Sequence, residues 1–276
     1  MAPRKKTPDA ESIEAFARGQ LDKVADGLDV ADEQSVHTAR KAFKRLRATV
    51  RLTRDRLGEE TRQRENAAFR DAGRELSGAR DARVVIDTLD ALDPKAFGVL
   101  RSALAAEYVE ATTAAARPDE AAVRGAVDDA RVRLESWPLD GDVGGALASG
   151  VARMQKRLRR AYRAAREDPT TEHLHELRKR AKDLWHAAEI LRPAAPKRMD
   201  RLARDAHRLA DLLGEDHDLA TLLVAADRHS STLTIDERAE LEALIADRRK
   251  RLQRKALRRA RKLCATKPRK LAKRIS

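Results

Sequence analysis

Basic side chains follow one face of the segment from residue 36 to residue 57. At about 100° per residue, a helix places side chains three, four and seven positions apart on one face. The only acidic residue of the segment is Asp55, and its apolar residues form a separate stripe. The basic face consists of His37, Arg40, Lys41, Lys44, Arg47 and Arg51. Like charges three or four residues apart destabilise an isolated helix, so this pattern indicates an anion supplied from outside.

A second segment repeats the beginning of this pattern later in the chain. Residues 36–54 read VHTARKAFKRLRATVRLTR, and residues 174–192 read LHELRKRAKDLWHAAEILR. The basic face of the second segment consists of His175, Arg178, Lys179 and Lys182. Trp185 and Glu189 then stand where the first segment has Arg47 and Arg51. We therefore expect the second half-site to be shorter or weaker at that end.

A third basic face precedes the second one. Residues 151–166 contain no acid, and their basic face includes Arg153, Lys156, Arg157 and Arg160. A solvated helix surface is the alternative interpretation of all three faces. Such surfaces usually mix acids with bases, as residues 59–75 do here. We favour anion binding for the unmixed faces.

The two histidines suggest phosphate rather than metal. His37 and His175 are expected in the first turn of their helices, where free N–H groups and the helix dipole favour an anion. A structural histidine that bonds a backbone carbonyl is the alternative. A metal site is disfavoured, because His173 and His175 are only two residues apart and no zinc-ligand spacing occurs.

The histidine segments belong to a longer internal repeat. Residues 76–81 read LSGARD and residues 213–218 read LGEDHD, at nearly the same offset as the basic faces. We interpret Asp81 and Asp218 as partners that position a basic residue, and Gly214 as a point of close helix approach. Two matches at nearly the same offset predict a tandem duplication of a helical unit.

The elements that carry these residues are predicted to be helices throughout. Gly and Pro together make up only 21 of 276 residues, and residues typical of helices dominate. Asp93-Pro94 predicts a helix start, and Thr234 with Glu237 predicts a capping box. The expected helices are 9–27, 35–57, 61–91, 94–116, 119–136, 145–167, 171–191, 196–229 and 235–265. We expect an all-α fold of two helical bundles, with repeats at about 9–137 and 145–265 and a loose basic tail at 266–276.

The formal net charge of +14 indicates a polyanionic partner. Residues 248–274 contain fifteen Lys and Arg and no acid, so the rest of the chain has 44 basic and 45 acidic residues. An anion site in this nearly neutral body must come from segregated charge. The single cysteine, Cys264, excludes an intramolecular disulfide, and no apolar stretch is long enough to span a membrane. We expect a cytoplasmic protein.

The paired motifs resemble those of the CHAD domain, the conserved histidine α-helical domain, over about residues 9–265. The resemblance implies two four-helix repeats around a basic central cavity that binds inorganic polyphosphate, and association with polyphosphate granules. It places the polyphosphate contacts on the three basic faces defined above. Trp185 and Glu189 depart from a fully basic second helix. The resemblance implies no catalytic residue, metal or cofactor.

Two other functions fit the basic faces less well. A nucleic-acid-binding protein could use the same faces and the C-terminal tail, but eight aromatic residues are too few and scattered for a base-stacking platform. A polyphosphate hydrolase or kinase would need a P-loop or clustered metal-binding carboxylates on the basic faces. The sequence shows neither, so we expect binding without catalysis.

Overall fold

The computed structural model of the chain describes residues 8–30, 33–76, 80–93, 95–114 and 119–273, and in these residues all regular structure is helical. The α-helices are α1 (Ala10–Val30), α2 (Glu33–Leu52), α3 (Arg54–Glu75), α4 (Arg80–Leu92), α5 (Gly98–Ala114), α6 (Glu120–Glu135), α7 (Val143–Glu167), α8 (Thr171–Ile190), α9 (Pro196–Arg228), α10 (Ile235–Cys264) and α11 (Pro268–Ala272). Two short 3₁₀ turns, Arg192–Ala194 and Ser230–Thr232, flank α9. The expectation of an all-helical protein is confirmed for the described residues.

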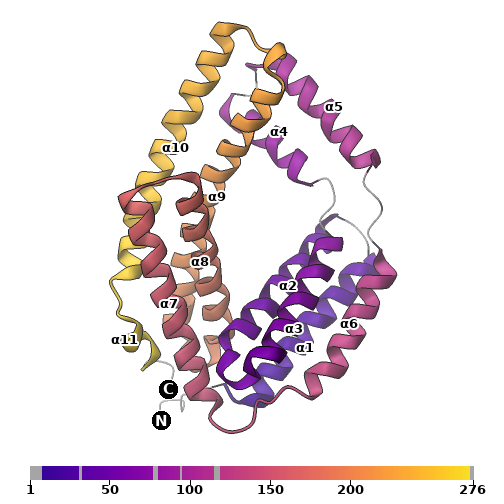
Figure 1. Cartoon of the computed structure of the whole chain (residues 1–276), viewed down its shortest axis with the longest axis vertical. Helices are drawn as coiled ribbons and strands as arrows, with labels where there is room; N and C mark the ends of the chain where they lie inside the picture. The colour runs from indigo at the N-terminus through magenta and orange to yellow at the C-terminus, as the bar shows by residue number, and fades with distance from the viewer. Residues whose placement is uncertain (1–7, 31–32, 77–79, 94, 115–118, 274–276) are drawn as a thin grey trace.

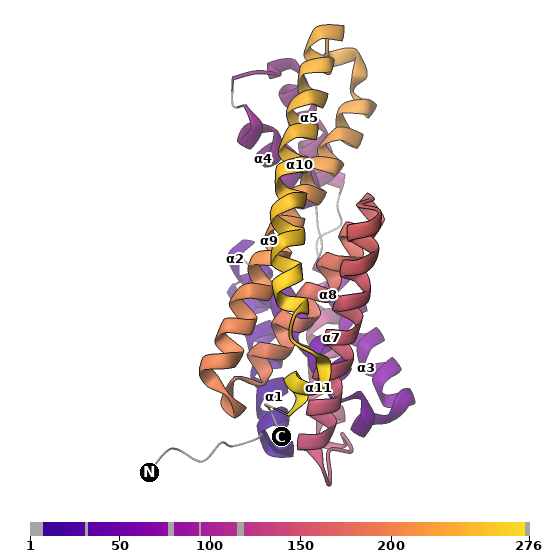
Figure 2. The ribbon, with the colours of Figure 1, turned by 90° about the vertical axis from the view of Figure 1, so that its left-hand side faces the viewer.

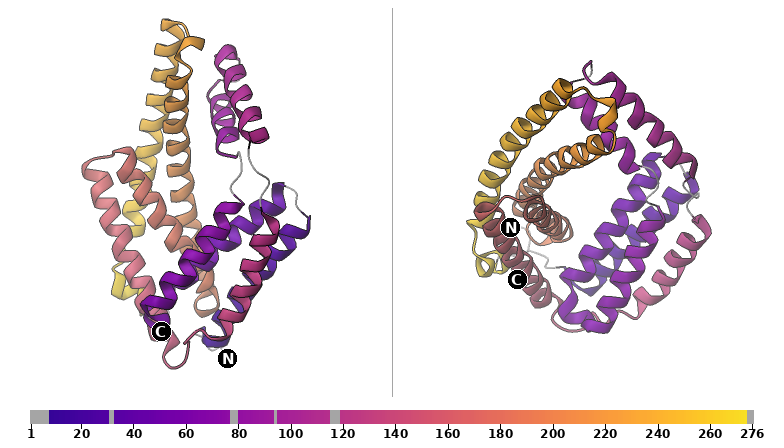
Figure 3. Two further views of the ribbon diagram at one scale, coloured as in Figure 1. Left: turned by 45° about the vertical axis from the view of Figure 1, so that its right-hand side comes forward. Right: turned by 45° about the horizontal axis from the view of Figure 1, so that its top comes forward.

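The helices form two neighbouring bundles and a hairpin (Figure 1). One bundle contains α1, α2, α3 and α6, and the other contains α7, α8, α9 and α10. The hairpin of α4 and α5 lies beside the C-terminal part of α9, as Figure 3 also shows. Figure 2, turned by 90°, shows that α9 and α10 continue past the ends of α7 and α8. The bundles meet through α2, which packs against both α7 and α8, and through α3, which packs against α7.

Two apolar clusters hold the helices together. The larger one runs through both bundles and includes Leu46 of α2 and Leu177 of α8, neither of which is exposed. The smaller one joins α4 and α5 to the C-terminal part of α9 and the N-terminal part of α10. It includes Leu89 of α4, Leu100 of α5 and Leu222 of α9. Each fully buried leucine contributes about 1.5–3 kcal/mol. The continuous larger cluster therefore fixes the basic faces of α2 and α8 relative to each other.

Local signals set where several helices begin. Asp142 and Thr170 cap α7 and α8 by accepting hydrogen bonds from backbone N–H groups of the first turn. The predicted capping box of Thr234 and Glu237 is confirmed at the start of α10. Gly150 lets α7 approach α2 closely, because a Cβ at this position would lie 2.1 Å from the carbonyl oxygen of Leu52.

Some predicted boundaries are wrong. The expected helix 61–91 is two helices, because α3 ends at Glu75 and α4 begins at Arg80. The interruption expected between residues 57 and 61 is confirmed, because Gly58 within α3 is non-helical (φ 74°). The expected helix 35–57 ends at Leu52, and the helix expected from residue 94 begins at Gly98. Ser77 and Gly78, between α3 and α4, lie outside the described residues. The tail is not loose in its first part, because α11 buries Leu271 against the core.

Candidate functional site

The structure brings the first and second basic faces together across the contact between α2 and α8. Lys44 of α2 and Arg178 of α8 lie close enough to Lys182 to disfavour its charge. Burial, followed by these two cations, lowers the pKa of Lys182 from 10.5 to about 8. The acids Asp211 and Asp218 offset this only in part and form no salt bridge with Lys182 among the described residues. Cations from the two repeated segments therefore converge on one point.

Arg178 lies against α9. A Cβ on Gly214 would come within 3.3 Å of an Arg178 guanidinium nitrogen, so the small residue makes room for this side chain. The close approach expected at Gly214 is thus to Arg178. The Nε atom of Arg178 is buried and meets no acceptor among the described residues. Burial raises the pKa of Asp218, while Arg178 and His217 oppose that rise, as expected for an acid that accompanies a basic cluster.

His175 belongs to the same cluster. Its ring lies 4.9 Å from that of His217, centroid to centroid. Burial, then Lys179 and His217, lower the pKa of His175, so its neutral form is favoured when no anion is bound. Its expected place in the first turn is wrong, because α8 begins at Thr171 and Leu174 already bonds to the Thr170 carbonyl. His37, half-buried, is likewise the fifth described residue of α2.

A basic hollow of about 260 Å³ opens between α2 and α3. Its lining comprises Arg40, Phe43, Lys44, Arg47, Phe69, Arg70, Gly73 and Arg74. Burial, then Arg51 and Arg70, lower the pKa of Arg47, whose Nε atom donates to Asn66 at 3.1 Å. The sequence interpretation missed Arg70 and Arg74, because Asp71 lies between them and made the segment resemble a mixed solvated face. Their spacing of four residues was the available signal.

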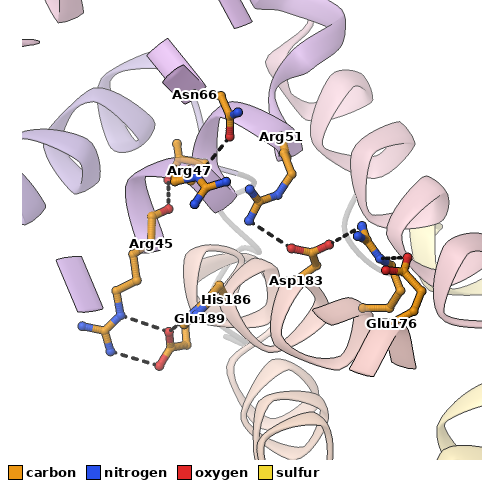
Figure 4. Close-up of polar contacts among 10 residues, drawn as sticks. Arg45, Arg47, Arg51, Asn66, Glu176, Asp183, His186 and Glu189 are labelled. Atoms are coloured by element: carbon orange, nitrogen blue, oxygen red, sulfur yellow. Dashed lines mark hydrogen bonds and ion pairs between the residues drawn. The ribbon is translucent and has the colours of Figure 1, made fainter. Parts of the chain in front are cut away.

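The C-terminal end of α2 is tied to α8 by ion pairs (Figure 4). Arg51 bonds to Asp183 at 2.9 Å, and Asp183 also accepts from Arg180 at 2.7 Å. Arg45 forms a two-pronged pair with Glu189, with both distances 3.2 Å. Arg51, one of the predicted anion-binding residues, thus already has a carboxylate partner.

Glu189 and Trp185, which interrupt the second basic face, have structural roles. Glu189 accepts from Arg45 and contacts His186 at 3.2 Å, and these partners lower its pKa to about 2 despite burial, which raises it. Trp185 stacks on His186, with ring centroids 4.6 Å apart, and lies 3.9 Å from the ring of His207. These residues hold α8 against its neighbours.

The residues of the basic face of α7 have different surroundings in the structure. Arg153 pairs with Asp55 and Ser149, and with Arg157 it lines a small hollow beside Arg51. Lys156 and Arg160 are exposed and line neither this hollow nor the one between α2 and α3.

The exposed residues Lys41 and Lys179 also lie outside both hollows. Parts of the basic C-terminal segment are balanced by acids of α9, as in the pairs of Arg249 with Asp216 and Arg259 with Asp205.

The described residues hold no group of three or more His, Cys, Asp or Glu side chains arranged to bind a metal ion. In the same part of the chain, no helix has the length and apolar character needed to cross a membrane.

Comparison with known proteins supports the family resemblance that the paired basic segments indicate. No curated protein matches the chain. The family model of the CHAD domain matches residues 15–227, which include α2, α8 and most of α9. This match covers most of the chain and both basic segments, and the protein therefore belongs to the CHAD domain family.

Proposed function

We propose that the protein binds inorganic polyphosphate, without catalysis, at the surface where α2 and α8 meet. The convergence of Lys44, Arg178 and Lys182 carries this proposal. Burial and then repulsion from Arg178 and Lys44 lower the pKa of Lys182, so its charged form is disfavoured when no anion is bound. A multivalent anion would relieve that repulsion, and Arg178 offers a buried donor beside it.

The proposed ligand path continues along α2. The hollow formed with α3 adds Arg40 and Arg47 to the central cluster, together with Arg70 and Arg74, which both pair with Asp71. A flexible anion with one charge per phosphate could follow cations placed about one helical turn apart. We also propose that the two bundles represent the duplicated four-helix unit and that the ligand occupies a basic cavity between them.

Polyphosphate suits this surface better than nucleic acid. All eight aromatic side chains are buried or half-buried. Phe43 and Phe69 are packed together 6.3 Å apart, and Trp185 is stacked within the protein. An exposed platform for bases is thus missing from the described residues, whereas a ligand without bases needs none.

A double charge reversal, Lys44→Glu with Lys182→Glu, tests the proposal. The control variant Lys23→Glu with Lys95→Glu makes the same change in net charge at exposed sites outside both hollows. Retention on immobilised long-chain polyphosphate is measured at fixed salt with a DNA competitor, and helix content is checked by circular dichroism.

We expect the site variant to lose retention while the control and the wild type keep it. Equal retention of site and control variants would refute the site. Displacement of the wild type by DNA at the same phosphate concentration would favour a nucleic-acid partner instead.

The same proposal includes a place in the cell. The family resemblance implies cytoplasmic polyphosphate granules as the location of the ligand. A fluorescent fusion is expected to co-localise with granules, and the Lys44→Glu, Lys182→Glu variant is expected to become diffuse. A wild-type fusion that ignores the granules would contradict this part of the proposal.

A further inference from the structure

A small, separate hollow lies where α2, α3, α7 and α8 meet, near the C-terminal end of α2. Its lining residues are Arg51, Arg54, Arg62, Gly150, Arg153, Met154, Arg157 and Asp183. Its volume of about 50 Å³ is room for a few water molecules or one tetrahedral oxyanion. Five of the eight lining residues are arginines, whereas the surface around Lys182 mixes lysine, arginine and histidine.

The charge of this hollow remains positive after its acids are counted. Asp183 lines the hollow and pairs with Arg51. Asp55 pairs with Arg153, and Glu59 pairs with Arg62 and, at 3.9 Å, with Arg54. Five arginines against three carboxylates leave a net charge of about +2. This positive charge would balance the two negative charges of a phosphate dianion.

Two donors of the lining have no acceptor. Arg51 Nε and Arg153 Nη2 are buried and meet no hydrogen-bond partner among the described residues. Buried donors are paired in the great majority of native structures. Guanidinium groups only donate, so the complementary ligand must only accept. A phosphate oxygen meets this requirement and forms charge-assisted bonds.

The close contact of α7 with α2 builds the hollow. Gly150 lies against the Leu52 carbonyl without an intervening side chain, and Arg153 follows one turn later on α7. Arg157, another turn on, is near enough to Arg51 to lower its pKa, after the larger effects of burial and the opposing effect of Asp183. The arginines therefore surround one point from three helices.

We propose that this arginine-lined hollow binds one tetrahedral oxyanion: inorganic phosphate, either free or as the terminal group of a polyphosphate chain. Binding of an end group rests on the proposed function, whereas binding of free phosphate does not. In the first case the hollow sets the direction and the end of the bound chain, and Lys44 and Lys182 hold its interior.

The test uses the full chain and the variant Arg54→Gln with Arg157→Gln. Arg157 is exposed and Arg54 has only a long contact to Glu59, so neither change strands a buried carboxylate. The matched control is Arg163→Gln with Arg166→Gln, two exposed arginines of α7 outside the hollow. Titration calorimetry at low salt measures binding of orthophosphate. A second arm compares long-chain polyphosphate with free and with chemically blocked ends.

We expect one orthophosphate per chain, with at least a tenfold loss of affinity in the site variant and less than a twofold change in the control. If only end groups bind, free-ended chains should bind at least fivefold better than blocked ones, and the site variant should remove this difference. The proposal is overturned if the site variant binds orthophosphate as the wild type does, or if orthophosphate fails to bind and both kinds of chain bind equally. The Lys44→Glu, Lys182→Glu variant separates the two proposals, because it should lose long-chain binding and keep orthophosphate binding.

Discussion

Replacement of Lys182 by methionine should stabilise the protein while it weakens polyphosphate binding. The fall of the Lys182 pKa from 10.5 to about 8 corresponds to roughly 3 kcal/mol for a group removed from solvent. Lys182 is only partly buried, so we reduce this cost of the charged form to about 2 kcal/mol. Methionine retains the apolar stem and removes both the desolvated charge and its repulsion from Arg178 and Lys44.

The pH dependence has a defined sign. Below pH 8 the folded and unfolded states both carry the proton, and the folded state bears the full cost of the charge. As the pH rises from about 8 towards 10.5, the folded state loses the proton first, so wild-type stability rises. The advantage of Lys182→Met should therefore be about 2 kcal/mol at pH 7 and about 1 kcal/mol at pH 9.5.

Urea unfolding at the two pH values measures this advantage. The control is Lys179→Met, which removes an exposed lysine of the same helix and should change stability by less than about 0.5 kcal/mol. Polyphosphate should reverse the order by stabilising the wild type more than Lys182→Met. The reasoning is refuted if Lys182→Met is no more stable than Lys179→Met at pH 7, or if its advantage does not shrink at pH 9.5.

Two further substitutions test how α2 is held. Gly150→Ala places a Cβ 2.1 Å from a backbone carbonyl of α2 and should cost at least about 2 kcal/mol in urea unfolding. Gly125→Ala, with no atom within 4 Å, should be neutral or stabilising, and equal effects of the two would contradict the close packing. Glu189→Gln breaks the pair with Arg45 and should cost about 2 kcal/mol at pH 7, whereas the exposed control Glu176→Gln should cost under about 0.5 kcal/mol. Because the pKa of Glu189 is lowered to about 2, its contribution is complete above pH 4.5 and is lost as the pH falls towards 2, so a cost that does not shrink in acid would be inconsistent with the pair.

The helical class and the basic faces could be predicted because helical periodicity is a local property of sequence. The apolar stripe of α2 enters the core at Phe43 and Leu46, and the basic residues remain on the other side, partly exposed. The exact ends of the helices were harder to predict. The interruption expected between residues 57 and 61 is confirmed at Gly58, whose φ of 74° is non-helical, but the preceding helical turn from Arg54 was expected to belong to the helix before it. The interruption between α3 and α4 was predicted as continuous helix.

The ion-pair partners of many cations could not be predicted, because the acidic residues that pair with them lie on helices distant in sequence. Asp183 directly follows Lys182, yet it pairs with Arg51 and Arg180, because adjacent helical residues point about 100° apart. In the same way, Asp55 balances Arg153 across 98 residues of sequence. Periodicity therefore identifies which cations share a face, and the tertiary structure decides which of them still attract a long anion.

That distinction ranks the predicted anion-binding residues. Arg178 and Lys182 form no salt bridge among the described residues, and burial, followed by repulsion from Arg178 and Lys44, lowers the pKa of Lys182. Arg51 and Arg153 are already paired, so their contribution to long-range attraction of a polyanion is small. Both line the small hollow, and each has a buried N–H group without an acceptor among the described residues. Under the two proposals, the three basic faces predicted from the sequence therefore contribute to two different sites: Arg178 and Lys182 to the surface for an extended anion, and Arg51 and Arg153 to the hollow for one phosphate.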